Sequence, residues 1–200
     1  MIKQKALNHK PTYYYKINKD KLDTLEAKKG IGLKPFLEDA MKTCPHEKFL
    51  KGPRSSQAKK EVEVDIKQLD HEVKLLARLG LESDYYSSAH MNVQMFMLGY
   101  DSKTVSIETP VWMNKDEQEK TGFFASDESL TGHIDLVRIE DDKIWIWDYK
   151  PDAHKEKHAH VQTFLYALML SKRTNIPLSQ FRCGYFDEEN VYAFNPSLKS

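Results

Sequence analysis

Two neighbouring apolar segments, residues 132–139 and 143–150, place charged side chains where a β-sheet would bury them. Both segments are rich in the β-branched and aromatic residues that favour strands, and a short acidic stretch connects them. Asp135 lies in the first segment, and Asp148 and Lys150 lie in the second. Because ionised side chains are costly to bury, their presence on two adjoining strands restricts the fold and indicates a site.

Side chains alternate across a strand, so Asp148 and Lys150 share one face of the second segment with Ile144 and Ile146. The Trp and Tyr residues between them face the other way. If the two segments pair through their short connection, Asp135 approaches Asp148. Adjacent carboxylates repel each other, and either a proton or a divalent cation relieves the repulsion. Because the donors are oxygens, with no thiolate, we expect Mg²⁺ or Mn²⁺.

A helix predicted over residues 161–170 follows the second segment and carries Gln162 and Tyr166 one turn apart, on the same side. An Asp-x-Lys triplet alone is common as a solvated pair, and a Gln that is satisfied by nearby backbone is the simpler interpretation of Gln162. The combination of both carboxylates, the lysine and this helix favours a site.

The remaining composition sets few limits on function. The chain has 200 residues, with 30 basic and 30 acidic side chains, so it has no global positive field, although a local stripe of lysines can still contact phosphates. It has 2 cysteines, no signal peptide pattern and no apolar run of membrane-spanning length. We therefore expect a cytoplasmic protein without a disulfide framework and without a membrane partner.

The pattern predicts an N-terminal extension over residues 1–33 and one domain over residues 34–200. In the extension we expect a short strand at 12–17 and a helix at 19–29. In the domain we expect helices at 61–79, ended by Gly80, and at 83–98, then a strand at 105–112 whose Pro110 marks an edge or an end. Further expected elements are a hairpin connection at 114–121, a strand at Phe123-Phe124, the two segments above, and a closing hairpin of 181–186 and 190–194.

The motifs Gly132-His133-Ile134-Asp135, Asp148-Tyr149-Lys150 and Gln162-x-x-x-Tyr166 resemble those of the PD-(D/E)XK nuclease superfamily, specifically its RecB-like branch. That branch includes helicase-attached exonuclease domains and CRISPR-associated nucleases. Residues 40–50, with Cys44-Pro45, are similar to the helix that opens such domains, and residues 183–186 are similar to their closing hairpin. The resemblance covers residues 35–195.

The resemblance implies an α/β restriction-endonuclease-like core, with a central mixed sheet flanked by helices and a helical N-terminal part. It implies that Asp135 and Asp148 bind the metal, that the Tyr149 carbonyl is a further ligand, and that Lys150 is the catalytic lysine. Gln162 and Tyr166 would lie beside the site and orient the lysine or contact the substrate.

Members of this branch usually contribute one more ligand, often a His from the helix that precedes the first strand. His90 and His71 are the two candidates, and a surface or core role is the alternative for each. Glu108 matches a glutamate often found in the branch, and it either supports the site or replaces the His ligand. His133, between Gly132 and Asp135, is expected to be structural.

Several relatives carry four cysteines that hold an iron–sulfur cluster. In this chain Cys44 occupies the place of the first, and Cys183 is the only other cysteine. We therefore expect no iron–sulfur cluster, and we expect Cys44 to be a small buried apolar residue.

The segment after the second strand combines His154, His158 and His160 with Lys155 and Lys157. Zinc binding is one interpretation of these histidines, but polar loops collect histidine readily. We expect the lysines to contact backbone phosphates. The tyrosines at 13–15 and 85–86 are candidates for stacking on unpaired bases, with packing as the simpler alternative.

Together these observations predict a Mg²⁺- or Mn²⁺-dependent deoxyribonuclease that acts on single-stranded DNA or duplex ends without sequence specificity, in DNA repair or recombination. The alternatives are a non-catalytic nucleic-acid-binding protein and a nuclease subunit that needs a helicase or recombination partner. Exonuclease or endonuclease action, cleavage polarity, DNA or RNA as substrate, and the oligomeric state stay open at this point.

Overall fold

A computed structural model describes residues 1–58, 62–121 and 126–197. Its centre is one mixed β-sheet in the order β1-β2-β4-β5-β6-β7-β8-β3, in which β6 and β7 run parallel and every other described pair is antiparallel. The strands are β1 (Ile2–Asn8), β2 (Thr12–Asn18), β3 (Lys67–Gln68), β4 (Thr104–Met113), β5 (Leu130–Glu140), β6 (Lys143–Tyr149), β7 (Phe181–Phe186) and β8 (Val191–Phe194).

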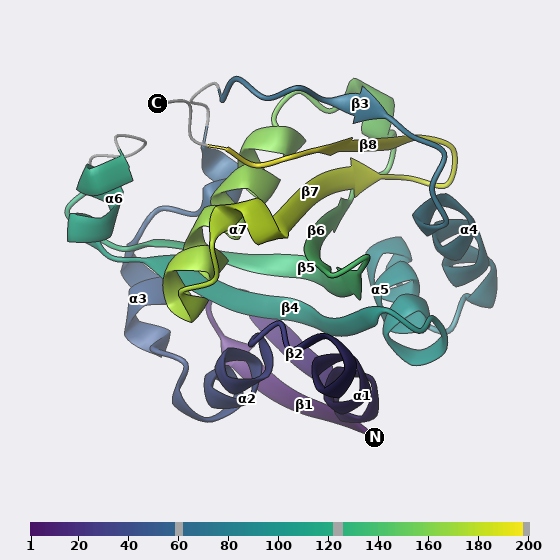
Figure 1. Ribbon diagram of the computed structural model, residues 1–200, viewed down its shortest axis with the longest axis horizontal. Coiled ribbons are helices and arrows are strands. Elements are labelled where there is room, and N and C mark those ends of the chain that lie inside the picture. Colours follow the sequence, from purple (N-terminus) through teal and green to yellow (C-terminus); the bar gives the residue numbers. More distant parts are fainter. Residues whose placement is uncertain (59–61, 122–125, 198–200) are drawn as a thin grey trace.

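Helices flank this sheet (Figure 1). They are α1 (Lys19–Lys29), α2 (Lys34–Thr43), α3 (His46–Lys51), α4 (Val73–Ser83), α5 (Ala89–Tyr100), α6 (Lys115–Thr121) and α7 (Ala159–Thr174). Helix α7 packs across β4, β5, β6 and β7, whereas α5 packs on β4 and β2 and against α4. None of the helices in the described residues has the length and apolarity needed to span a bilayer.

Strand β6 confirms the predicted alternation of side chains. Ile144 and Ile146 belong to the hydrophobic core beneath α7, whereas Trp147 and Tyr149 belong to the core beneath α4 and α5. Asp148, which shares the face of Ile144 and Ile146, is thereby directed toward the α7 side of the sheet. The alternation therefore fixes on which face of the sheet its charged residues meet.

Helix α7 also confirms its prediction, because it is buried nearly all round. Phe164, Leu165, Ala167 and Met169 are among its buried side chains. The Thr163 hydroxyl donates a hydrogen bond to the Ala159 carbonyl, which satisfies a polar group that would otherwise be buried without a partner.

The N-terminal residues extend the main sheet. Strand β2 and helix α1 were predicted, and β1 was not, because β1 is mostly polar and exposed and so lacks an apolar alternation. Strand β2 joins β4 through Lys16 and Ile17. The Tyr15 hydroxyl donates to the Leu37 carbonyl at 2.9 Å, which connects the hairpin to α2. The division of the chain at residue 33 stays a prediction.

The helix predicted over residues 61–79 is wrong at its start. Among the described residues it begins at Val73, and β3 before it pairs with the open edge of β8. Gly80 lies inside α4 and does not end it. A Cβ at Gly80 would lie 2.8 Å from the Val93 Cα, so glycine permits the close contact between α4 and α5.

The next predicted helix, at 83–98, also begins later, at Ala89. Asp84 ends α4 in the left-handed conformation, with φ 44°, and interrupts the helical pattern. The Ser88 side chain then accepts a hydrogen bond from the Met91 amide, as an N-cap residue does. These local polar interactions separate the two helices.

The polar stretch at 114–121 connects β4 and β5, but it forms helix α6 and not the predicted hairpin connection. The Glu117 carboxylate accepts a hydrogen bond from the Asn114 amide at 2.8 Å, which stabilises the first turn. The strand predicted at Phe123-Phe124 lies outside the described residues.

Pro110 lies inside β4, although proline was expected at an edge or a strand end. It pairs with His133 of β5 on one side, and the pairing of β4 with β2 ends at Ile107. Pro110 therefore sits where β4 has one described neighbour, so the missing amide breaks no interstrand bond. Pro110 was correctly expected at an open strand edge, but it does not mark the end of β4.

Candidate active site

The carboxyl groups of Asp135 and Asp148, on the neighbouring strands β5 and β6, lie close enough for each to shift the pKa of the other. Asp148 is completely buried and Asp135 is nearly so. Burial, followed by the charge of Asp135, raises the pKa of Asp148 well above its usual range. Burial opposes the ionisation of Asp135 too, but the charges of His90 and Lys150 lower its pKa. The two carboxylates therefore repel each other when both are ionised, and a bound cation would relieve that repulsion.

Lys150 directly follows β6. Its backbone amide donates to the Phe186 carbonyl at 2.9 Å and continues the pairing with β7. Its Nζ lies 2.7 Å from the Asp148 Oδ2. Burial works against the ammonium form, but the carboxylates of Asp148 and Asp135 outweigh it and raise the pKa of Lys150. The lysine is therefore a fixed positive charge beside the acidic pair.

The two candidate histidines lie in different places. His90, at the start of α5, is half-buried and points its Nε2 at the Asp135 Oδ2, 2.8 Å away. The Asp135 charge raises the pKa of His90 to about 9. His71 lies beside Glu140, with its ring near those of Trp145 and Trp147. The structure brings His90 to the site and leaves His71 outside it.

Glu108 and Asp135 lie between two paired positions of β4 and β5, Ile107 with Leu136 and Thr109 with Ile134. Its backbone is in the left-handed region, with φ 50°, which costs on the order of 1–3 kcal/mol for a residue other than glycine and is typical of functional positions. Burial, followed by the Asp135 charge, raises the pKa of Glu108 to about 7. Glu108 therefore adds a third acidic group to the site.

Gln94 is a residue that the sequence analysis missed. It is fully buried, and its Nε2 donates to the Glu108 Oε1 at 2.8 Å and to the Asp135 carbonyl at 3.4 Å. Its spacing of one helical turn from His90 was the available signal, because residues four apart share a helix face. Gln94 thus orients Glu108 from the same helix that supplies His90.

The side chains of His90, Glu108 and Asp135 each offer one ligand atom, and these atoms all lie within 4.8 Å of one another. A nitrogen, two carboxylates and the adjacent Asp148 form a donor set that suits a hard divalent cation. The raised pKa values of Glu108 and Asp148 reflect acidic charge that such a cation would neutralise. The residues present therefore fit a divalent metal.

Tyr149 contacts the site through its backbone. Its amide donates to the Asp135 Oδ2 at 3.2 Å and helps to hold that carboxylate in place. Its side chain packs on the other face of the sheet, near His90 and Phe186. The predicted role of the Tyr149 carbonyl as a metal ligand stays a prediction.

Gln162 and Tyr166 contact each other on α7, where the Gln162 Nε2 donates to the Tyr166 hydroxyl at 2.8 Å. Burial and the nearby carboxylates raise the pKa of Tyr166 well above its usual range, so the phenol is neutral. Gly132 makes room for the tyrosine, since a Cβ there would lie 2.4 Å from the Tyr166 Cε1 and 2.6 Å from the Ser55 Oγ. This explains the glycine of the first motif.

A pocket of about 190 Å³ opens onto this site. Arg54 brings a positive charge to it, and no motif in the sequence pointed to this arginine. The arginine is held by the Tyr13 hydroxyl at 2.7 Å and by the carbonyls of His9 and Lys10. The pocket is lined by Tyr13, Arg54, Ser55, Ser56, His90, Glu108, Gly132, His133, Asp135, Gln162 and Tyr166.

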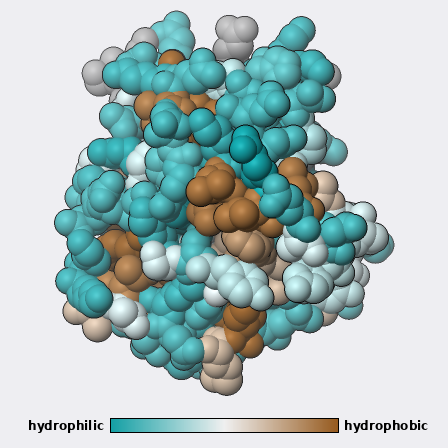
Figure 2. Space-filling model, turned by 90° about the vertical axis from the view of Figure 1, so that its right-hand side faces the viewer, coloured by the Kyte–Doolittle hydropathy of each residue, from teal (hydrophilic) through white to brown (hydrophobic). Residues whose placement is uncertain are grey.

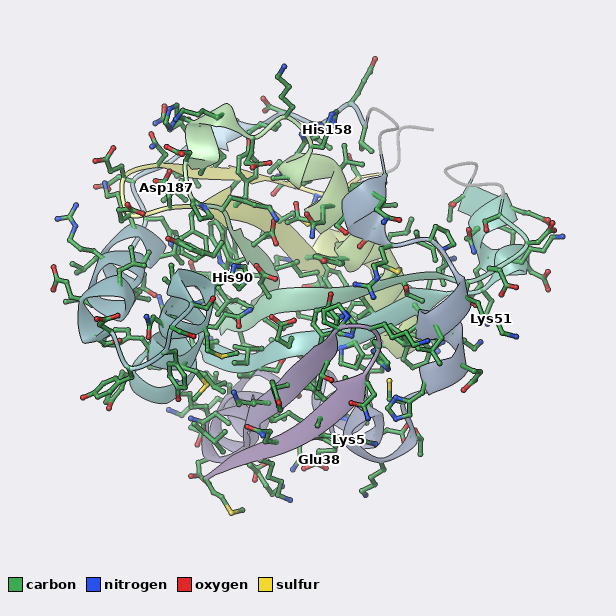
Figure 3. All side chains as sticks on the ribbon, turned by 180° about the vertical axis from the view of Figure 1, so that it is seen from behind. Lys5, Glu38, Lys51, His90, His158 and Asp187 are labelled. Atoms are coloured by element: carbon green, nitrogen blue, oxygen red, sulfur yellow. The ribbon has the colours of Figure 1, made fainter. Side chains whose placement is uncertain are left out.

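The other sequence candidates lie away from these groups. Two candidate metal clusters occur among the described residues, and neither includes His154, His158 or His160. Figure 3 shows His158 at the surface. Lys155 is exposed and pairs with Asp152 at 3.0 Å. Lys155 is therefore open to solvent, and the three histidines of this described segment do not form a metal cluster.

The tyrosine runs differ in exposure. Tyr15 is buried in the core, Tyr13 stacks on His133 with ring centroids 3.7 Å apart, and Tyr85 is 80% exposed. Figure 2 shows hydrophobic side chains gathered on the face that carries α4 and α5. Large exposed hydrophobic residues of this part are Leu75, Leu79, Tyr85, Tyr86 and Tyr100. Packing accounts for Tyr13 and Tyr15, whereas Tyr85 and Tyr86 are open to a ligand.

A family model of the PD-(D/E)XK nuclease superfamily matches residues 37–196, and the chain belongs to that superfamily. The mixed sheet with flanking helices is consistent with its restriction-endonuclease-like α/β fold. The comparison with curated proteins gave no match.

Proposed function

We propose that the protein is a Mg²⁺- or Mn²⁺-dependent deoxyribonuclease of the RecB-like branch, which hydrolyses single-stranded DNA or duplex ends without sequence specificity. The observation that carries this proposal is the convergence of His90, Glu108 and Asp135 within 4.8 Å, beside the Asp148–Lys150 pair. Membership of the nuclease superfamily supports the same reaction class.

Asp135, Asp148, Glu108 and His90 would hold the cation, through carboxylate oxygens and the His90 Nε2. A divalent ion at this position polarises a phosphoryl oxygen and lowers the pKa of an attacking water. His90 must lose its proton before it can serve as a ligand, and a cation beside Asp135 would promote that loss. The acidic groups are thus both the ligands and the reason that a cation binds.

Lys150 contributes a positive charge at a fixed place. Held at 2.7 Å from Asp148, its ammonium group can orient the attacking water and stabilise the negative charge that develops on phosphorus. The neutral Tyr166 hydroxyl and the Gln162 amide supply further hydrogen-bonding groups at the pocket wall. We infer that these two residues position the lysine or the scissile phosphate.

The shape of the pocket favours an extended strand as the substrate. The carboxylates are buried, and about 190 Å³ of space leads to them, which suits one phosphodiester better than an intact duplex. Arg54 at the wall is placed to contact a backbone phosphate, which carries no sequence information. Exposed Tyr85 and Tyr86, which precede the helix of His90, are candidates for stacking on unpaired bases.

The test is cleavage of end-labelled single-stranded and duplex DNA, and of matched RNA, by the wild-type protein with Mg²⁺, Mn²⁺ or EDTA. We expect metal-dependent cleavage of single-stranded DNA, and the ladder of products separates digestion from an end from internal cutting. Cleavage that appears only after a helicase or recombination protein is added would assign a partner-dependent subunit. Binding without cleavage by the folded protein under all conditions would overturn the proposal in favour of a non-catalytic nucleic-acid-binding protein.

A further inference from the structure

A second group of potential metal ligands lies at the N-terminal side of the domain and does not belong to the acidic site. His9 is in the turn between β1 and β2, Cys44 directly follows α2, and His46 begins α3. One ligand atom from each of these side chains lies within 4.8 Å of the other two. Three separate segments of the chain therefore meet at these residues.

The donor set differs in kind from that of the acidic site. A thiolate and two imidazoles suit Zn²⁺ and similar borderline transition metals, whereas Mg²⁺ prefers oxygen ligands. The His9 Nε2 and the His46 Nδ1 are 2.9 Å apart. Two nitrogens bound to a tetrahedral zinc ion lie about 3.3 Å apart, so the rings would separate by only a few tenths of an ångström.

The surroundings of His9 match those of a metal-binding histidine. Its Nδ1 lies 2.8 Å from the His133 Nε2, and its ring stacks on Phe49 with centroids 4.0 Å apart. Metal-bound histidines commonly donate the second ring N–H to a partner that fixes the ring orientation and the tautomer. If the His9 Nδ1 donates to His133, the Nε2 carries the free lone pair that a metal requires.

The protonation states of the free side chains are compatible with this arrangement. Burial, then the charges of His46 and Arg54, lower the pKa of His9 to about 4, so its ring is neutral at neutral pH. Burial raises the pKa of the Cys44 thiol to about 12. A metal ion would therefore bind with release of the Cys44 proton, and its affinity would fall in acid.

We propose that His9, Cys44 and His46 form a second metal site, suited to Zn²⁺, with the fourth position open to water. Such a site joins the β1–β2 turn to the connection between α2 and α3. It stabilises the N-terminal hairpin against the rest of the domain, and its metal binding does not require the proposed nuclease activity. Without a metal, His9 and His46 form a hydrogen-bonded pair next to the Cys44 thiol.

Cobalt substitution tests the proposal, because a Co²⁺–thiolate bond gives a charge-transfer absorption in the near ultraviolet that oxygen and imidazole ligands do not give. Metal-free wild-type protein is titrated with Co²⁺, and bound Co²⁺ is then displaced with Zn²⁺. We expect the thiolate absorption in the wild-type protein and its loss in Cys44→Ser. The Cys183→Ser variant is the matched control, because Cys183 is also fully buried and belongs to neither cluster.

The His46→Ala variant provides a second measurement that avoids a buried substitution. We expect its Zn²⁺ affinity to be about 100-fold weaker or more, since even the groups that orient a ligand contribute 10–100-fold. We also expect Zn²⁺ to raise the unfolding temperature of wild type and of Cys183→Ser more than that of Cys44→Ser, which keeps only the acidic site. Absence of the thiolate absorption in folded wild-type protein, or its persistence in Cys44→Ser, would overturn the proposal.

Discussion

Strand β5 passes through two buried charged clusters, which differ in how fully basic groups offset their carboxyl groups. Glu108 and Asp148 both approach the carboxyl group of Asp135, so three acids share one place. Around Arg138, which is fully buried, each carboxyl group has a basic partner: Glu140 lies 3.4 Å from Arg138 and 2.6 Å from the Lys103 Nζ. The remaining partners of Arg138 are Glu72 and Asp101.

The pKa values record the difference. Burial opposes ionisation in both clusters, but hydrogen bonds from His71 and Lys103, with the charge of Arg138, lower the pKa of Glu140 to about 2. Burial and a neighbouring carboxylate raise the pKa of Asp148. A buried charge is therefore no sign of a site by itself. The acidic groups that lack enough cationic partners are the ones suited to a metal.

We expect the largest difference between the two clusters when Asp148→Asn and Glu140→Gln are compared for cleavage rate and for unfolding free energy. Loss of the Asp148 carboxylate removes metal-assisted stabilisation of about 4 kcal/mol, so cleavage should fall about 1,000-fold. The same change should raise the unfolding free energy in EDTA at pH 8, because it removes a carboxylate whose ionisation the fold disfavours. Glu140→Gln should keep the cleavage rate and lower the unfolding free energy. Equal loss of activity in both variants would contradict the distinction.

The next effect concerns acid stability. The pKa of Glu140 is lower in the folded protein, at about 2, than its ordinary value of 4.5, so the folded state favours the ionised form. Its contribution is full above pH 4.5 and disappears as the pH falls toward 2, with a loss of about 3 kcal/mol. Urea unfolding between pH 2 and 6 measures this loss. The Glu140→Gln variant should show a correspondingly flatter profile, and an unchanged profile would refute the assignment.

Alanine variants of His90 and His71 form a matched pair, and we expect a smaller effect on cleavage from them. His90 lies 2.8 Å from the Asp135 carboxylate, and His71 lies 3.4 Å from Glu140. We expect His90→Ala to reduce cleavage about 10–100-fold and to raise the Mn²⁺ concentration needed for half-maximal rate. His71→Ala should leave both quantities within about 2-fold of wild type. If His71→Ala changed the Mn²⁺ concentration needed for half-maximal rate and His90→Ala did not, the cation would lie beside Glu140, which would contradict the assignment.

The smallest effects come from Gly132→Ala and Gly184→Ala. An added Cβ at Gly132 meets Tyr166, and one at Gly184 meets the Trp147 ring at 2.2 Å. Both variants should lose about 1–3 kcal/mol of unfolding free energy through overpacking. Only Gly132→Ala should also lower kcat, because it displaces Tyr166 beside the carboxylates. Chemical denaturation measures the unfolding free energy of each variant, and steady-state cleavage measures its kcat. Equal kcat values in the two variants would contradict a role for Tyr166 in the site.

Much of the candidate active site was predictable because its residues follow local periodic patterns. The alternation in β6 indicated that Asp148 and Lys150 share a face, and the helical spacing brought Gln162 next to Tyr166. The contributions of Gln94 and Arg54 depend on how α5 and the loop after α3 pack on the sheet, which no local pattern reports. The metal-binding roles themselves stay predictions.

The fold was predictable to a similar extent. Strongly patterned elements such as β5, β6 and α7 were predicted, whereas β1 and α6 were missed because their residues are mostly polar. The misplaced start of α4 arose because a short apolar run fits a helix or a strand equally well, and an open edge on β8 decided between them.

The most direct test of the account is an anomalous difference map from crystals of the wild-type protein soaked with Mn²⁺. We expect a peak among the side chains of His90, Glu108 and Asp135, with Asp148 adjacent, and no peak in Asp135→Asn crystals. A map without density there, or with its peak beside Glu140, would contradict the claim that the acidic cluster on β5 is the metal centre.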